Sequence, residues 1–493
     1  MTEPCYTCRR RRVQCDQSGT PCDKCKKAGI DCLKERPLRW VRGVAIRGGM
    51  RGRSYEDPPT AVISSANSAT GGRHIQDNGE QCGNNGFVSI PTGLSDPALL
   101  RLAPASRYYL DYYNHQICKL FIVYDSQRNP FRALISIALN SPMLLDAVLS
   151  LATRHRANIS RPFADNGQPT GSELASIYHD AIHFKYRAIQ RLSRAVSCPR
   201  LRMADETVAT VFLLIFLDLL ESGCDRWNKH IEGAKSLMAL MGPEDPGHMV
   251  QQIRRFITKE IYLIETLGAA LVRPRLITGF TSPAELTVPD EDIVEESFLG
   301  CPAYLLKAVR YISLQRDSLV GTWPTTHSFP LEQLQGLTAT LESVENFNGQ
   351  LWAAGLSSSP KASGLYALFR SYQLATLLFG HRVHDALKNE STPQDTLVLE
   401  LLSVTALIKD DYPHLLKCTL WPIFIAGLEC RQLPERNFVM SALEKFYEDT
   451  RCINVANAAQ ILQNYWVEHD QPGADSAGWV FGVSHLRHDW LLV

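Results

Sequence analysis

The sequence predicts two folded parts, a small cysteine-rich domain and a large all-α helical domain, joined by a disordered linker. Six cysteines within the first 32 residues predict the small domain. The linker is predicted at residues 57–104, which are rich in Pro, Ser, Asn, Gly and Thr. A segment of this composition cannot bury enough apolar surface to offset the entropy lost on ordering. From Arg107 onward, apolar residues recur at three- and four-residue spacing and strand-like alternation is scarce, which predicts helices.

The six cysteines form an internal repeat. Each half has two cysteines separated by two residues and a third after six more. Such spacing lets two sulfurs bind one metal from a tight turn, and thiolate softness favours zinc. The predicted metal ligands are Cys5, Cys8, Cys15, Cys22, Cys25 and Cys32.

Coordination numbers indicate how many zinc ions these cysteines hold. Two tetrahedral zinc ions need eight metal–ligand bonds, whereas six thiolates used once each supply six. If one thiolate from each half bridges both metals, the count reaches eight. We therefore expect two Zn²⁺ per chain, with a net charge of minus two on the cluster that neighbouring basic residues offset.

Other uses of these cysteines are disfavoured. A disulfide framework would need an oxidising compartment, and the chain starts Met-Thr-Glu-Pro without an apolar signal segment. An iron–sulfur site would not need two equal halves. The remaining eight cysteines show no metal spacing and are expected to be reduced, mostly buried thiols: Cys82, Cys118, Cys198, Cys224, Cys301, Cys418, Cys430 and Cys452.

Charge is divided unevenly along the chain. The formal net charge is zero, but residues 1–53 carry 14 Lys+Arg against five Asp+Glu, and the remainder carries 37 against 46. A basic head on an acidic body suggests a polyanionic partner for the head. The longest apolar run, Val208–Leu220, is interrupted by Asp218 and is too short to cross a bilayer. We expect a buried helix there, no membrane partner and an intracellular protein.

The residues around the cysteines carry a resemblance to a known family. A basic run, Arg9-Arg10-Arg11-Arg12, follows the second cysteine, Asp16 follows the third and Pro21 precedes the fourth. This pattern resembles the fungal Zn(II)2Cys6 binuclear-cluster transcription regulators. The resemblance implies a Zn2Cys6 binuclear cluster domain in the nucleus. It also implies that Cys5 and Cys22 are the two bridging ligands.

By the same resemblance, double-stranded DNA is the partner of this domain. A short helix after the second cysteine would enter the major groove, where Arg11 and Arg12 would read guanines of a CGG triplet in genes of RNA polymerase II. Arg9 and Arg10 would hold phosphates, and Lys24, Lys26 and Lys27 would contact the DNA backbone. The family usually carries Lys at the positions of Arg12 and Gln14, so one phosphate contact is lost at Gln14. The alternative is that the arginine run serves as a nuclear-localisation signal, and both can hold.

A basic arm follows the cluster. Residues 36–53 contain no acidic residue, and Arg42 and Arg47 alternate there with glycine and apolar residues. An extended arm along phosphates and a solvated linker are equally favoured. The segment is similar to the acriflavine-sensitivity-control type of fungal regulator in Trp40, Val41, Gly43, Val44, Ala45, Arg47 and Gly48. The expected domains are cluster, basic arm, linker and helical regulatory domain, at 1–36, 37–56, 57–104 and 105–493.

The helical domain is expected to be an array of antiparallel helices. Tyr108–Phe121 has the spacing of one amphipathic helix, and Ser141 with Pro142 predicts a capped helix start that runs to about Arg156. Glycine and proline clusters separate the elements at 242–247, 273–289, 321–330 and 355–363. Further helices are expected at 172–196, 201–222, 226–241, 247–272, 301–319, 364–388, 396–410, 414–430, 435–449 and 453–468.

This array carries a second resemblance. The segment Leu144–Ala152, the spacing of Trp227, His230 and Gly233, and the segment Trp421–Gly427 are similar to the second type of fungal-specific transcription factor domain. The likeness spans roughly 105–490. It implies a regulatory domain for which a small-molecule effector and a coactivator are expected partners. No apolar heptad follows the cluster, which weakens the case for a homodimer.

Catalysis finds little support in the sequence. No nucleophile elbow, phosphate-binding glycine loop or zinc-protease motif is present, so no catalytic residue and no enzyme activity are predicted. The histidine pairs His179/His183 and His485/His488 are expected to be structural. An acidic and apolar stretch at 289–299 is expected to be a loop, with an activation segment as its alternative. A second function remains open, a metal- or redox-sensing regulator whose cluster thiols are the switch.

Overall fold

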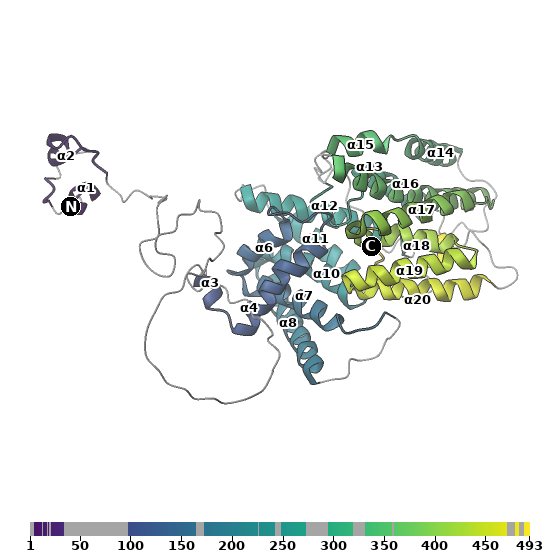
Figure 1. The fold of residues 1–493 in the computed structure, drawn as a ribbon, viewed down its shortest axis with the longest axis horizontal. Coiled ribbons are helices and arrows are strands. Elements are labelled where there is room, and N and C mark those ends of the chain that lie inside the picture. The colour runs from purple at the N-terminus through teal and green to yellow at the C-terminus, as the bar shows by residue number, and fades with distance from the viewer. Residues whose placement is uncertain are drawn as a thin grey trace, which may run out of the picture. The chain divides into compact units, whose positions relative to one another are not determined.

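A computed structural model gives the fold (Figure 1), which divides into two units, Met1–Val88 and Ser89–Val493. Each unit is described by itself. The residues that the structure describes are 4–11, 13–16, 18, 21–33, 97–163, 172–224, 226–241, 248–272, 294–318, 331–356, 359–470, 479–482 and 488–493. The predicted basic arm and most of the predicted linker lie outside these residues.

The first unit is built on two short helices, α1 (Tyr6–Arg10) and α2 (Asp23–Lys27). Each helix begins directly after a cysteine, because Cys5 and Cys22 occupy the N-cap positions with extended backbone. Cysteines form the buried cluster of this unit, with Cys15 and Cys32 packed against it. An interior made of sulfur atoms means that apolar burial contributes little to holding this unit together.

The second unit is all-α, as predicted. Among its described residues the extended pairing is limited to one isolated antiparallel bridge between Cys224 and Trp490. Its N-terminal half contains α3 (Pro97–Leu100), α4 (Pro104–Tyr112), a π-helical turn (Tyr113–Ile117), α5 (Cys118–Leu120), α6 (Pro130–Ala138), α7 (Pro142–Asn158), α8 (Ser172–Ser197), α9 (Pro199–Arg202), α10 (Asp205–Glu221), α11 (Trp227–Leu240) and α12 (His248–Leu271).

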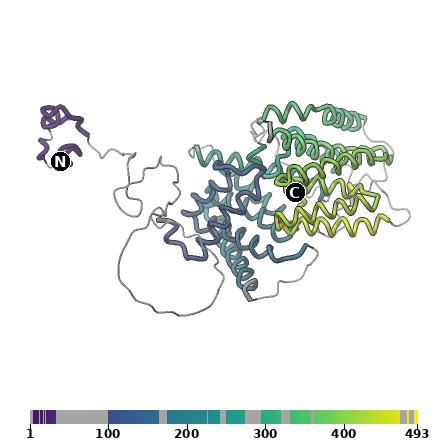
Figure 2. The backbone as a smooth tube through the Cα atoms, in the orientation of Figure 1, coloured from purple at the N-terminus to yellow at the C-terminus, as the bar shows by residue number. Residues whose placement is uncertain are grey.

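The C-terminal half of this unit begins after the segment 294–301. It contains α13 (Ala303–Ser318), α14 (Leu331–Glu345), α15 (Gly349–Leu356), α16 (Ser359–Lys388), α17 (Asp395–Asp411), a 3-10 helix η2 (Pro413–Cys418), α18 (Leu420–Glu429), α19 (Leu433–Thr450), α20 (Ile453–His469) and α21 (Trp479–Gly482). Helices α16 to α20 pack each against the next, and the backbone trace in Figure 2 shows them side by side.

Two helices are enclosed by the others. The apolar run Val208–Leu220 lies in α10 and is buried along its whole length, as predicted, between α7, α11 and α12. Every residue of α18 is buried as well, between α16, α17, α19 and α20. A helix that is apolar on all sides requires such an enclosed position.

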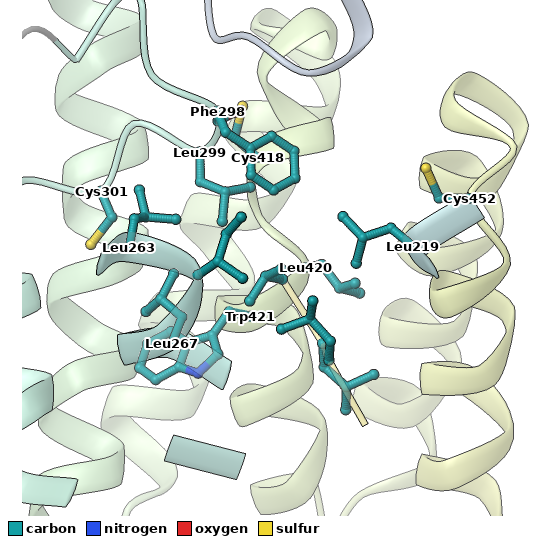
Figure 3. Close-up of a cluster of buried hydrophobic side chains, with 14 of the residues drawn as sticks. Leu219, Leu263, Leu267, Phe298, Leu299, Cys301, Cys418, Leu420, Trp421 and Cys452 are labelled. Atoms are coloured by element: carbon teal, nitrogen blue, oxygen red, sulfur yellow. Dashed lines mark hydrogen bonds between the residues drawn. The ribbon is translucent and has the colours of Figure 1, made fainter. Parts of the chain in front are cut away.

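The two halves of the helical unit share one core. Figure 3 places Leu219 from α10, Leu263 and Leu267 from α12, and Leu420 and Trp421 from α18 in one cluster of buried side chains. Phe298 and Leu299 also enter this cluster, from the segment 294–301. The described part of the acidic stretch 289–299 is therefore a loop whose apolar residues are buried in the core, and 289–293 lie outside the described residues.

Several helix boundaries differ from the predictions. The start of the helical unit precedes residue 105, because α3 lies within the predicted linker and Leu99 and Leu102 pack against the core. The helix predicted at 201–222 begins at Asp205, and the one predicted at 364–388 begins at Ser359. Helices α6, α14 and α15 were not predicted, since short or weakly periodic segments give a poor sequence signal.

Other predictions about this unit are confirmed. Ser141 caps α7 by accepting a hydrogen bond from the Leu144 N–H, with Pro142 in the first turn. Trp227 and Trp421 are fully buried. No disulfide joins the described cysteines of the helical unit, and most of them are buried; Cys82 lies outside the described residues. None of the described helices is both long enough and apolar enough to cross a membrane.

Candidate metal centre and nucleic-acid interface

The two short helices position the first two cysteines of each half. As N-cap residues, Cys5 and Cys22 have φ/ψ of −61°/149° and −68°/154°. The second cysteine of each half lies on the first turn of the helix that this N-cap cysteine begins, Cys8 on α1 and Cys25 on α2. The N–H of Cys8 donates to the Cys5 sulfur at 3.4 Å. The repeat in the sequence is therefore a repeat in structure.

The six sulfurs gather into two groups of four. One group contains Cys5, Cys8, Cys15 and Cys22, and the other contains Cys5, Cys22, Cys25 and Cys32. Within each group the sulfur atoms lie within 4.8 Å of one another. Both groups contain Cys5 and Cys22, the two residues that the resemblance assigns as bridging ligands.

The spacing of the sulfurs fits zinc. Four sulfurs about 2.3 Å from one zinc ion lie about 3.8 Å apart at the corners of a tetrahedron. The sulfur of Cys22 is 3.7 Å from that of Cys8 in the first group. The sulfur of Cys5 is 3.8 Å from that of Cys25 in the second group and 3.9 Å from that of Cys22, which both groups share.

The two shared thiols lie in surroundings that favour their charged form. The Cys8 N–H lowers the pKa of the Cys5 thiol, and the Cys25 N–H lowers the pKa of the Cys22 thiol, in each case against the effect of burial. Backbone N–H groups at a helix N-terminus stabilise a negative charge in this way. A sulfur that binds two metal ions must be a thiolate, so this placement suits the N-cap cysteines.

Each half of the domain also caps the helix of the other half. The Asp16 carboxylate accepts hydrogen bonds from the N–H groups of Asp23 at 3.2 Å and Lys24 at 3.0 Å, at the start of α2. Burial would raise the pKa of Asp16, but hydrogen bonds from Ser18 and from these N–H groups outweigh it and lower the pKa. The Asp16 side chain is thus held as an ionised cap.

The corresponding contacts at α1 join the Thr7 side chain and the Tyr6 N–H to the backbone of Asp31 and Leu33. The Tyr6 N–H donates to the Leu33 carbonyl at 2.7 Å. The Thr7 hydroxyl donates to the Asp31 carbonyl at 2.7 Å and accepts from the Leu33 N–H at 3.0 Å. Asp16 and Leu33 each follow the third cysteine of their half, so the same position serves both helices. Sequence reasoning noted Asp16 from the family pattern but missed its capping role and that of Thr7.

The second helix ends in a tight turn that needs glycine. Gly29 has φ +61°, in the left-handed region. The Ile30 N–H donates to the Cys25 carbonyl at 3.2 Å, and the Gly29 N–H donates to the Lys26 carbonyl at 3.2 Å. This pair of bonds is a Schellman motif. The Val13 N–H makes the equivalent bond to the Cys8 carbonyl at 3.1 Å, seventeen residues earlier.

The basic residues predicted to contact DNA are partly placed by the structure. Arg9 on α1 and Arg11 at its C-cap are exposed, and so are Lys24, Lys26 and Lys27 on α2. The backbone of Arg10 belongs to α1. The structure therefore brings Arg9 and Arg11 onto one short exposed helix pinned by two cysteines. Arg12, Arg42 and Arg47 lie outside the described residues.

The described histidines do not form a second metal site. His179 and His183 lie on α8 with stacked rings 6.3 Å apart, and no described carboxylate or cysteine completes a metal-binding group with them. His485 of the other pair is outside the described residues. The two groups of cysteine sulfurs are the metal-binding arrangements found within the residues that the structure describes.

The chain combines a domain held by cysteine sulfurs, which has exposed basic helices, with a large helical unit. This combination defines a zinc-cluster protein of the DNA-binding class. Comparison with known families agrees. Residues 3–41 match the fungal Zn(2)-Cys(6) binuclear cluster domain, and residues 108–493 match the fungal specific transcription factor domain. The chain belongs to this family of fungal transcription regulators. The family's cluster domain binds zinc and DNA, and the family normally acts in the nucleus.

Curated relatives agree with this assignment. The chain is 25% identical over 438 residues to the acriflavine sensitivity control protein acr-2 of Neurospora crassa, a match that covers 83% of this chain and 70% of that protein. It is 44% identical over 43 residues to the transcriptional regulatory protein pro1 of the same organism, covering 9% of this chain and 6% of that protein. No solved structure matches the chain significantly.

Proposed function

We propose that this chain is a nuclear, sequence-specific regulator of RNA polymerase II genes that reads CGG-type triplets in double-stranded DNA through a cluster of two zinc ions. The observation that carries the proposal is the arrangement of six sulfurs in two groups of four that share Cys5 and Cys22. Two tetrahedral ions with two bridging thiolates use all six cysteines and leave no coordination position open. A closed site of this kind is structural, so the chemistry of the unit lies in its exposed basic surface.

The proposed reading residues are Arg11 and Arg12. The guanidinium of arginine bonds guanine O6 and N7 together, and a bidentate pair of this kind distinguishes guanine from other bases. Exposure of Arg11 where α1 ends supports this assignment, because the proposed contact requires a side chain open to the major groove. Arg9, Arg10 and Lys24 are proposed to hold phosphates, together with Arg42 and Arg47 of the basic arm. Phosphate contacts position the protein without selecting a sequence.

Fluorescence anisotropy with the zinc-loaded full chain tests this proposal. Three labelled duplexes are compared at one stated salt concentration, carrying a single CGG, paired CGG sites or a scrambled sequence. We expect preference for CGG, with Arg11→Ala or Arg12→Ala losing about tenfold or more of that preference. Arg9→Ala should weaken binding to all three duplexes equally. Equal, salt-sensitive binding of the unchanged chain to all three would contradict sequence reading.

The helical unit is proposed to regulate the DNA-binding unit. Its size and continuous core are suited to holding a ligand or partner, and a small-molecule effector is the partner proposed below. A coactivator contact and a homodimer stay predictions. Tight binding only to the paired CGG duplex in the same anisotropy experiment would support the homodimer.

A further inference from the structure

The helical unit has a hollow of about 460 Å³ at one end of its C-terminal helices. It lies where α18 ends, α19 begins and α20 ends, beside the loop that joins α16 to α17. Pockets for small molecules span about 300–1,000 Å³. A second hollow among the described residues, near Phe121 and Leu219, has a volume of about 10 Å³ and is too small for a ligand.

Each acidic side chain on the wall of this hollow is already paired with an arginine. Asp470 is bound by the Arg436 guanidinium through two contacts of 2.8 Å. Glu429 is bound by the buried Arg382 guanidinium at 2.7 and 2.6 Å. Paired carboxylates of this kind have little attraction left for a cation.

One cation on the wall has no such partner. Arg431 is exposed, and its guanidinium has no ion-pair or hydrogen-bond partner within the residues that the structure describes. Only its backbone N–H is engaged, by the Glu435 carboxylate at 3.2 Å. A guanidinium presents a planar fork of N–H donors that fits a carboxylate in a bidentate pair. Arg431 is therefore the group on this wall that is available to pair with an anionic ligand.

Aromatic rings line another side of the hollow. The rings of Tyr465 and His469 are stacked with centroids 3.8 Å apart. Trp466 is buried, its indole N–H donates to the Gly427 carbonyl at 2.8 Å, and the Arg436 guanidinium lies 5.2 Å from the centre of its ring. Flat, fixed rings of this kind favour a planar apolar group beside them.

From these observations we propose that the hollow binds a small aromatic carboxylate, with its carboxylate on Arg431 and its ring against Tyr465 and Trp466. This inference deepens the regulatory role given to the helical unit under the proposed function. Glu429 on the wall of the hollow is hydrogen-bonded to buried side chains of the unit. Glu429 also accepts a hydrogen bond from the Trp479 indole N–H of α21 at 2.6 Å, and Arg382 donates to the Thr392 carbonyl at 2.8 Å.

The proposal is tested with 2-naphthoate as the probe, titrated into the full chain while the fluorescence of the ligand is followed. Uncharged 2-naphthamide and non-aromatic cyclohexanecarboxylate are the comparison ligands. We expect saturable binding of 2-naphthoate at one site, with binding of both comparison ligands at least about tenfold weaker. Absence of saturable 2-naphthoate binding at millimolar ligand would overturn the proposal.

A substitution at Arg431 tests whether 2-naphthoate binds in this hollow. Arg431→Gln should weaken 2-naphthoate at least about tenfold and leave 2-naphthamide unchanged, because only the charged pair is lost. Arg194→Gln, at an exposed position on α8, is the matched control and should bind as the unchanged chain does. Equal 2-naphthoate affinity in Arg431→Gln and the unchanged chain would place the ligand elsewhere and refute the assignment. Since the readout uses no DNA, loss of CGG preference in the anisotropy experiment would refute the proposed function alone.

Discussion

Asp16 shows how a single side chain connects the two halves of the zinc-cluster unit. It follows the third cysteine of the first half and caps α2 of the second half through the N–H groups of Asp23 and Lys24. The residue that follows Cys15 is thereby fixed to the helix that carries Cys25. Groups that orient metal ligands in this way affect metal affinity although they do not touch the metal.

Asp16→Asn should accelerate zinc release from the cluster. The amide keeps the shape of the side chain but offers one acceptor oxygen in place of two and carries no charge at the helix N-terminus. We expect zinc transfer to a colorimetric chelator to become severalfold faster. Asp31→Asn is the matched control, because Asp31 contacts α1 through its backbone carbonyl. An identical rate for Asp16→Asn and the unchanged chain would show that the cap does not support the metal site.

His155 is a buried histidine that couples the stability of the helical unit to pH. The Tyr112 hydroxyl lies 2.7 Å from its Nδ1 atom. Burial, with smaller contributions from Arg451 and Arg156, lowers the pKa of His155 to about 4. In the unfolded chain the pKa of histidine is about 6.5, so the unfolded state binds the proton first as pH falls.

Stability of the helical unit should therefore fall between about pH 6.5 and pH 4, by about 3 kcal/mol in total from this group. Above pH 6.5 the histidine is neutral in both states and contributes no pH dependence. His155→Gln, which retains a polar group for Tyr112, should flatten this part of a plot of melting temperature against pH. A variant with the same acid-side slope as the unchanged chain would mean that other groups cause the loss.

At the scale of elements, a buried ion-pair network joins three helices of the C-terminal half. Arg382 of α16 is fully buried and binds Glu429 of α18 and, at 3.0 Å, Asp385 one turn further along α16. The Trp479 indole N–H of α21 donates to the same Glu429 carboxylate. Asp385 in turn accepts from the N–H and hydroxyl of Thr392, in the loop before α17. Ion pairs as well as apolar packing therefore fix how these helices lie against one another.

Arg382→Met should destabilise the helical unit strongly. Removing one partner of a buried pair leaves the Glu429 and Asp385 carboxylates without their cation, at a cost of roughly 3–5 kcal/mol. For a unit of this size that corresponds to a melting temperature lower by about 4–6 °C. Arg194→Met, on the exposed face of α8, is the control and should change the melting temperature little. A drop in Arg382→Met no larger than in this control would show that the network contributes nothing to stability.

At the scale of the whole molecule, the two units depend on different forces. The zinc-cluster unit has sulfur atoms in place of an apolar core, whereas the helical unit has a continuous buried core across both halves. A segment of about 30 residues without an apolar core needs its metal to fold, and zinc binding supplies on the order of 10 kcal/mol.

Chelation of zinc should therefore abolish DNA binding while the helical unit keeps its melting temperature. A zinc chelator added to the full chain is expected to remove the anisotropy signal on the CGG duplex, and readdition of zinc should restore it. Circular dichroism of the same sample should retain its helical signal, since the helices lie almost entirely in the second unit. DNA binding that persists without metal would refute the metal-dependent fold.

Much of this molecule was predictable because its strongest signals are local. The spacing of the cysteines predicted a metal site, the proline and serine at 141–142 predicted the start of α7, and the apolar run at 208–220 predicted a buried helix. Each of these depends on residues within a few positions of one another, where backbone geometry limits the outcomes. The all-α class and the family followed from the same local patterns.

Other features were decided by the tertiary structure alone. The cap of α2 by Asp16, the contact of Thr7 with Leu33, and the burial of Phe298 in a core shared with α10 and α18 all join residues distant in the sequence. The same holds for the buried network around Arg382 and for the hollow beside Arg431. No local pattern marks such contacts, because their energy depends on the packing of elements whose arrangement the sequence does not show directly. The sequence by itself determined the zinc ligands to expect and the helical class, and packing decided which distant groups meet.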